Sequence, residues 1–282
     1  MSATIQQSPQ RTGDPTVAEL RHRAEVPTLI LAGLMTLAGL TVAAVAALQG
    51  VNVPAWATAA LAGLAAPVLA GVIFIRYLYW KNVADGVEIT EHQLPDVYRI
   101  YRELAVQMGM EETPRLYLAN GNGSINAFAS KCQLRRHYIV IWSDLLDIAY
   151  EHGDFAGVRF VLAHELGHVK CGHVDLWRQA IMAVPRVIFF GRTVTRAQEY
   201  TADRCAAYYS PEGARSMMVL FAGKRMYRHC SVDAYLHSIE NHKDGFWLKF
   251  SNFLSDHAVG WRRIQPLADI ETNGWDQHGK ML

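Results

Sequence analysis

The sequence predicts a mainly α-helical protein with a small β-sheet, of the α+β class, preceded by a two-helix transmembrane hairpin. Three observations predict this architecture: a long uncharged apolar stretch near the N-terminus, several segments with helical periodicity, and two short apolar runs typical of strands. At 282 residues the chain is long enough for one sizeable domain with appendages. We expect a polar tail over 1–25, the hairpin over 26–80, a soluble domain over 81–270 and a second tail over 271–282.

The apolar stretch predicts two membrane spans. No charged residue occurs from Val26 to Ile75. About fifty residues at ~1.5 Å per residue are too many for one helix across a ~30 Å hydrocarbon core, and they suit two. The polar, turn-forming segment 49–54 divides the stretch, so we expect spans at about 27–48 and 55–76. The alternative is a buried helical hairpin in a soluble protein.

Basic residues predict how this hairpin is oriented. Arg21 and Arg23 precede it, Arg76 and Lys81 follow it, and its turn carries none. The positive-inside rule therefore places both termini and the soluble domain on the cytoplasmic side, which predicts an integral protein of a bacterial inner or plasma membrane. Frequent Ala and Gly residues favour close helix contact, either within the hairpin or between copies of the chain in a homo-oligomer.

Composition argues against two other classes of protein. The formal net charge of +1 gives no reason to expect a nucleic-acid partner, and no pattern of basic and aromatic residues suggests one. The four cysteines are scattered without a Cys-x-x-Cys pair, which argues against a disulfide framework and against a cysteine zinc site.

The soluble domain begins with a helix and continues with strands. Helical periodicity predicts a helix from Glu91 to about Met110. The segments 114–119 and 137–142 predict two strands, and Ser143 begins another helix. A further helix is expected from near Phe155, and the remaining segments are mostly helical in pattern.

That further helix carries the clearest chemical motif of the chain, His-Glu-Leu-Gly-His at 164–168. Because His164 and His168 are four residues apart, both imidazoles project from one helix face, as two corners of a zinc tetrahedron require. Glu165 is then placed to take a proton from a water in the open fourth position, whose pKa zinc lowers toward about 7. The alternative is a surface helix that carries these residues by chance.

A zinc peptidase site needs a third protein ligand. Spacing excludes the metzincin position, and a slip of one residue turns a helical side chain by about 100°, so we expect His173 to be exposed or to contact a ligand instead of binding metal. Glu199 and Asp203 are the better candidates because they are four residues apart on a later helix. One carboxylate could bind metal while the other hydrogen-bonds a ligand histidine from behind.

These motifs together resemble a known family. His164–His168 with Arg196–Asp203, the segment Asn126–Ala129, and His257 followed by Arg263 and Ile264 resemble peptidase family M48, the integral-membrane zinc proteases related to HtpX and Ste24. The resemblance extends from about residue 90 to about 267. It implies a zincin-type metalloprotease domain with one Zn²⁺ per chain, bound by His164, His168 and Glu199. Glu165 would be the general base, and Asp203 would orient a ligand.

The resemblance also implies residues that contact substrate. A polypeptide would add as a strand beside Asn126, Ala127 and Phe128, although an ordinary meander with Phe128 in the core is an equal alternative. His257 and Arg263 would lie near the metal and stabilise the oxyanion, although Ala258 replaces the expected proline and a lone histidine is usually structural.

The segment 174–192 departs from the HtpX pattern. HtpX-like members have further transmembrane helices between the histidines and the glutamate, whereas the apolar part of this segment is interrupted by Pro185 and Arg186 and is too short to cross a bilayer. It suits a membrane-surface helix or a lid over the cleft, and equally an amphipathic helix packed on the domain.

The leading hypothesis is a membrane-anchored zinc endopeptidase acting on unfolded or membrane polypeptides, in membrane-protein quality control. One alternative is a non-proteolytic zinc-containing scaffold or chaperone that binds extended segments, which the intact Glu165 argues against. Another is a processing peptidase of narrow specificity, whose enclosed chamber two membrane spans cannot build.

Overall fold

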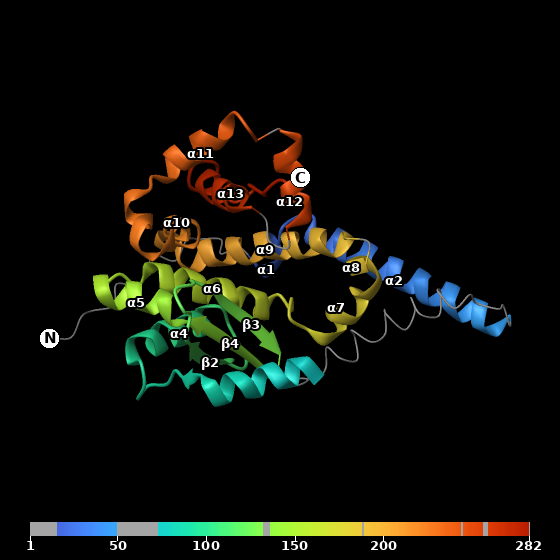
Figure 1. The fold of residues 1–282 in the computed structure, drawn as a ribbon, viewed down its shortest axis with the longest axis horizontal. Coiled ribbons are helices and arrows are strands. Elements are labelled where there is room, and N and C mark those ends of the chain that lie inside the picture. The colour runs from blue at the N-terminus through green and yellow to red at the C-terminus, as the bar shows by residue number, and fades with distance from the viewer. Residues whose placement is uncertain are drawn as a thin grey trace.

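The computed structural model of the chain describes residues 16–49, 73–131, 136–187, 189–243, 245–255 and 259–281. Helices dominate these residues, and one small mixed sheet lies among them (Figure 1). The mainly helical α+β class is therefore confirmed. Of the expected membrane hairpin, the first helix lies within the described part of the chain, whereas residues 55–72 of the second span lie outside it.

The sheet has four strands in the order β1-β2-β4-β3. The strands are β1 (Val87–Glu88), β2 (Arg115–Ala119), β3 (Ala127–Lys131) and β4 (His137–Trp142). β2 and β4 match the two strands that the sequence predicts, and they pair in parallel, whereas β3 pairs antiparallel with β4. β3 therefore forms one edge of the sheet, as the resemblance implies for 126–129.

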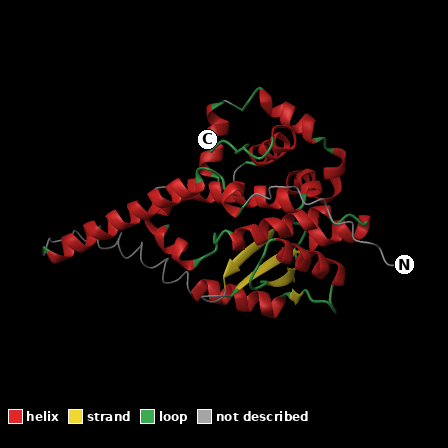
Figure 2. Ribbon diagram, turned by 180° about the vertical axis from the view of Figure 1, so that it is seen from behind, coloured by secondary structure: helices red, strands yellow, loops and turns green. Residues whose placement is uncertain are grey.

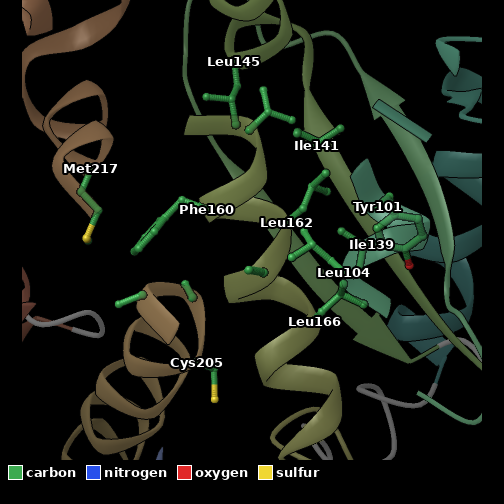
Figure 3. Packing of buried hydrophobic residues seen from close by; sticks show 14 of the residues in the cluster. Tyr101, Leu104, Ile139, Ile141, Leu145, Phe160, Leu162, Leu166, Cys205 and Met217 are labelled. Carbon is green, nitrogen blue, oxygen red and sulfur yellow. The ribbon is translucent and has the colours of Figure 1, made fainter. Parts of the chain in front are cut away.

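Both faces of β4 are covered. Ile139 and Ile141 point toward the helices α4 (Pro95–Gln107) and α6 (Ala156–Lys170), as the close-up of the core shows (Figure 3). Tyr138 and Val140 point the other way, in a cluster with Tyr79 and Val83 of the helical residues 73–85. The alternation follows from the two-residue period of a strand.

A long helix, α9 (Phe190–Tyr209), packs on the side of α6 that faces away from the sheet (Figure 2). Small residues allow the close approach: a Cβ added to Gly167 would lie 3.1 Å from the Cβ of Cys205 and 3.5 Å from the Cα of Ala202. α5 (Ser143–His152) follows β4, and the chain beyond α9 forms a helical cap. The cap consists of η1 (Pro211–Met217), α10 (Met218–Met226), η2 (Tyr227–His229), α11 (Val232–Glu240), α12 (Phe246–Leu254) and α13 (Gly260–Asn273).

The N-terminal helix α2 (Glu25–Leu48) projects away from these layers (Figure 1). Within the described residues it is the one helix long and apolar enough to cross a membrane, by length and composition, over Glu25–Ala46. It packs against α9 and against the short helices α7 (Leu176–Ile181) and α8 (Ala183–Val187). Leucine, isoleucine and valine side chains are exposed in both of its halves, so protein covers only part of this apolar helix.

The short helices α7 and α8 form most of the segment 174–192. The Thr36 hydroxyl of α2 donates to the carbonyl of Ile181 at 2.6 Å, and Gly39 of α2 faces Val184. Trp177 and Phe189 remain exposed. α7 and α8 therefore pack beside α2, and the choice among a membrane-surface helix, a lid over the cleft and an amphipathic helix packed on the domain remains a prediction.

The two polar segments expected as tails are docked where the structure describes them. Arg204 of α9 is buried, and its guanidinium donates to the carbonyls of Leu20 at 2.8 Å and Trp275 at 2.7 Å, one from each end of the chain. It also bonds the carbonyls of Glu19 and Gln277. Nothing in the sequence indicates this docking, because polar segments carry no hydrophobic pattern and main-chain carbonyls are the groups that dock them.

Candidate metal centre

α6 brings two histidines and a glutamate to one place. The Nε2 atoms of His164 and His168 are 3.1 Å apart, and the ring centroids are separated by 4.7 Å. The rings project from the same helix face because the residues are four positions apart. Two ring nitrogens this close can both ligate one ion when neither carries a proton.

Glu199 on α9 completes the group. Its Oε2 lies 3.7 Å from His164 Nε2, and its Oε1 lies 3.4 Å from His168 Nε2. One ligand atom from each of the three residues falls within 4.8 Å of the others. Zinc bound tetrahedrally at ~2.0–2.1 Å would hold neighbouring ligand atoms about 3.3 Å apart, so this donor set fits the ion without rearrangement of either helix.

Burial and charge shape the acid–base properties of the centre. Burial raises the pKa of the Glu165 carboxyl, while His164 and His168 act in the opposite direction. Burial alone would lower the pKa of His168, but its hydrogen bond to Glu199 and the nearby carboxylates raise it to about 9. A metal bound at Nε2 requires the neutral imidazole, so metal binding at this centre is expected to release a proton.

Asp203 and Arg263 support the His164 side. Asp203 Oδ1 lies 2.9 Å from His164 Nδ1, on the ring edge opposite the shared site. Arg263 of α13 makes two hydrogen bonds to Asp203, from Nε at 2.8 Å and from Nη2 at 2.6 Å. Burial alone would raise the pKa of Asp203, but Arg263 and His164 lower it and keep the carboxylate charged. Arg263 Nη1 also lies 3.7 Å from Glu199 Oε2.

The centre lies in a cleft of about 240 Å³. Its walls include the edge-strand segment Asn126–Ala129, along with Phe160, Leu220 and Arg263. A backbone hydrogen bond connects Ala129 to the Glu165 carboxylate, so the strand and the candidate base are in contact. Phe128 borders the cleft while its ring contacts Tyr138 on the far face of the sheet, at 6.2 Å between centroids.

The sequence-predicted site residues therefore come together in large part. His164, Glu165, His168, Glu199 and Arg263 line one cleft with Asn126, Ala127 and Phe128, and Asp203 lies directly behind His164. His257 lies outside the described residues. The catalytic and substrate-binding roles assigned to these residues from the sequence remain predictions.

Sequence reasoning missed one residue near the centre, Glu25. This carboxylate is the first residue of α2, its side chain is 0% exposed, and it lies 3.1 Å from the ring of His173. His173 in turn contacts His168, with the two Nδ1 atoms 2.9 Å apart. An acidic residue in the first turn of a helix is ordinary, because it complements the helix dipole, so the sequence carried no signal for this contact.

Comparison with known proteins gives a family match and distant relatives. Residues 91–190 match the family model described as Peptidase family M48. A "Protease HtpX homolog" of Dictyoglomus thermophilum is 28% identical over 140 residues, 47% of this chain and 44% of the relative. The "Plastoglobule-localized metallopeptidase 48, chloroplastic" of Arabidopsis thaliana is 26% identical over 187 residues, 60% of this chain and 52% of the relative.

A second "Protease HtpX homolog", from Paraburkholderia phytofirmans, is 30% identical over 124 residues, 43% of this chain and 41% of the relative. The chain thus spans about half the length of the curated relatives it matches. No solved structure matches it. The family match supports a metallopeptidase and does not favour the scaffold alternative. It confirms the resemblance to peptidase family M48 that the motifs of this sequence carry.

Proposed function

We propose that this protein is a membrane-anchored, zinc-dependent endopeptidase. The observation that carries the proposal is the convergence of His164, His168 and Glu199 in a cleft that also holds Glu165. A zinc ion held by these three residues would lower the pKa of a coordinated water toward about 7 and polarise the scissile carbonyl. The family match supports the same class of chemistry.

Glu165 is the proposed general base. It would accept the proton of the attacking water and then deliver it to the leaving amine, which requires a carboxyl whose pKa lies above that of an exposed glutamate. Its burial raises the pKa in that direction. The hydrogen bond from Ala129 orients the carboxylate beside the cleft.

The edge strand β3 is the proposed substrate-binding element. Its other side pairs with β4, so the side along the cleft is open to an added strand, and main-chain hydrogen bonds would bind polypeptide with little regard for side-chain identity. Asn126, Ala127 and Phe128 would contact the substrate. Arg263 would add positive charge near the oxyanion of the reaction, and we assign His257 to the same task from the family resemblance.

The proposed anchor is the N-terminal hairpin over 26–80, with α2 as its first span. The exposed apolar side chains along α2 support this assignment, because a large apolar surface without a partner is unfavourable in water. The position of α7 and α8 beside α2 supports a membrane-surface role for 174–192. A catalytic domain at 81–270 so placed, on the cytoplasmic side, suits unfolded and membrane polypeptides as substrates in quality control.

The test compares Glu165→Gln with the wild type in detergent. We expect the variant to retain one zinc ion per chain and to lose at least about 100-fold in hydrolysis of an unfolded protein such as casein, because the base is lost and the ligands remain. A chelator should abolish wild-type hydrolysis. Glu151→Gln, at an exposed carboxylate of α5, is the matched control. Unchanged turnover in Glu165→Gln would contradict the assignment.

A further inference from the structure

Glu25 occupies an unusual position for the first residue of an apolar helix. It is fully buried inside the domain, where an isolated carboxylate would be strongly unfavourable. Four side chains from three other segments compensate it. These are Arg21, which forms an ion pair with Oε1, Arg178 with Nη1 at 3.1 Å, His173 with Nε2 at 3.1 Å, and Thr201, whose hydroxyl donates to Oε2 at 2.6 Å.

The contact with His173 leads directly to the metal centre. His173 Nε2 faces Glu25, and His173 Nδ1 lies 2.9 Å from Nδ1 of His168. A metal bound at Nε2 of His168 leaves the ring proton on Nδ1, so His173 must accept at Nδ1 and carry its own proton on Nε2. That proton then points to Oε1 of Glu25. The chain of donors and acceptors has one consistent direction, and it ends on the carboxylate.

The same segments also hold the end of the helix that carries His168. The carbonyl of Cys171, just beyond the last residue of α6, accepts from Arg21 Nη2 at 3.0 Å and from Arg178 Nη2 at 3.0 Å. Both guanidinium groups pair with Glu25. Positive charge at a helix C-terminus is stabilising, and the three residues together fix this end of α6 relative to α2.

We propose that Glu25 and His173 are positioning residues for His168, so that the N-terminal apolar helix is part of the support of the metal centre. The inference rests on the proposed function, because it takes His168 as a metal ligand. Its physical basis is the rule that the second nitrogen of a ligating histidine is held by a hydrogen-bond partner, whose loss typically lowers metal affinity or activity about 10- to 100-fold. A displacement of α2 would then weaken metal binding.

The experiment measures zinc affinity by competition with a chromogenic chelator, in detergent, on the full chain. His173→Phe keeps the ring volume and removes both nitrogens, and we expect the dissociation constant to rise about 10- to 100-fold. Glu25→Gln keeps an acceptor for His173, so we expect a smaller rise. In the double variant the dissociation constant should rise by less than the two single effects combined, because one route from Glu25 to His168 passes through His173.

Thr36→Val is the matched control, because it removes a hydrogen bond between α2 and α7 without touching the chain from Glu25 to His168. We expect its zinc affinity to equal that of the wild type. The visible spectrum of the cobalt-substituted protein is the second readout, and it should change in His173→Phe and not in Thr36→Val. If His173→Phe does not fold, His173→Asn replaces it, since its shorter side chain cannot reach Glu25; the expected direction is the same.

Wild-type affinity in the His173 variant would overturn the proposal, as would additive effects of the two substitutions or an equal loss in Thr36→Val. These outcomes are independent of turnover. A wild-type chain that binds zinc but does not hydrolyse polypeptide would remove the endopeptidase proposal, and the affinities would still decide the positioning role.

Discussion

His164 and His168 lie one turn apart on α6, but different parts of the chain support them. Behind His164 are Asp203 and Arg263, from α9 and α13. Behind His168 are His173, just beyond α6, and Glu25, at the start of α2. Each of these two sets, the Asp203 half and the Glu25 half, contains a carboxylate, which one guanidinium group holds in the first (Arg263) and two hold in the second (Arg21 and Arg178).

The difference lies in which elements the two halves join. The Asp203 half connects the two helices that carry the candidate ligands, α6 and α9, with α13 of the helical cap, and it involves no residue of α2. The Glu25 half connects the domain to the apolar helix, and its key contact joins residues 148 positions apart. From this we infer that the first half sets the rigidity of the centre, whereas the second makes the centre responsive to the position of α2.

The largest expected effect comes from the Asp203 half. Asp203→Asn keeps the size of the side chain but removes the carboxylate that accepts both hydrogen bonds of the buried Arg263, which is then left with the more distant carboxylate of Glu199 at 3.7 Å. Breaking a buried pair in this way typically costs about 3–5 kcal/mol of the free energy of unfolding. Urea unfolding in detergent measures the loss, and Asp233→Asn, at an exposed position of α11, is the control. A change within about 0.5 kcal/mol, the range typical of surface substitutions, would show that Asp203 is not the main support.

A smaller effect on stability is expected at Gly167, where α6, which carries both histidines, packs tightly on α9. A methyl group in Gly167→Ala would lie 3.1 Å from Cys205 Cβ, between α6 and α9. Overpacking of this kind costs about 1–3 kcal/mol, and separating the helices would move both histidines away from Glu199. Thermal unfolding and zinc affinity should fall together.

The control for this variant is Gly33→Ala in α2, where an added Cβ has no atom within 4 Å. We expect its unfolding temperature and zinc affinity to stay at the wild-type values. If Gly167→Ala changed neither the unfolding temperature nor the zinc affinity, the close contact between α6 and α9 at Gly167 would not be required for stability or for metal binding.

The smallest expected effect concerns the segment that leads into Glu25. His22 is buried, its Nε2 contacts the Gly279 carbonyl at 2.8 Å, and its Nδ1 accepts from the N–H of Ala24 at 3.1 Å. Burial lowers the pKa of His22, and burial lowers that of the adjacent His278 to about 4. Because the folded-state pKa values lie below the unfolded value near 6.5, this docking is fully stable above about pH 6.5 and weakens as the pH falls.

Hydrogen exchange of residues 16–24 between pH 7 and pH 5 tests this. We expect local opening, corrected for the intrinsic rate, to increase at the lower pH in the wild type and to depend less on pH in His22→Gln. The exposed His92 provides the control substitution. A pH-independent opening free energy in the wild type would contradict the assigned pKa shifts.

The residues of the Asp203 half could be predicted from the sequence, whereas Glu25 in the other half could not. His164, His168, Glu199 and Asp203 come from helical spacing, since side chains four residues apart must share a helix face. Arg263 was predicted as a site residue only from the resemblance to a family. Glu25 was unpredictable, because an acidic residue at a helix start has an ordinary explanation, and the contact that gives it meaning depends on how α2 docks.

The sequence by itself determined the helical class, the apolar N-terminal helix, the sheet strands β2 and β4, and the two pairs of residues that meet at the metal centre. Each of these follows from periodicity or from local spacing, which the backbone geometry of a helix or strand converts directly into position. The tertiary structure alone decided that both polar end segments dock on α9, that α7 and α8 lie beside α2, and that Glu25 reaches His173. These depend on main-chain carbonyls and buried charges from distant segments, whose partners no local pattern specifies.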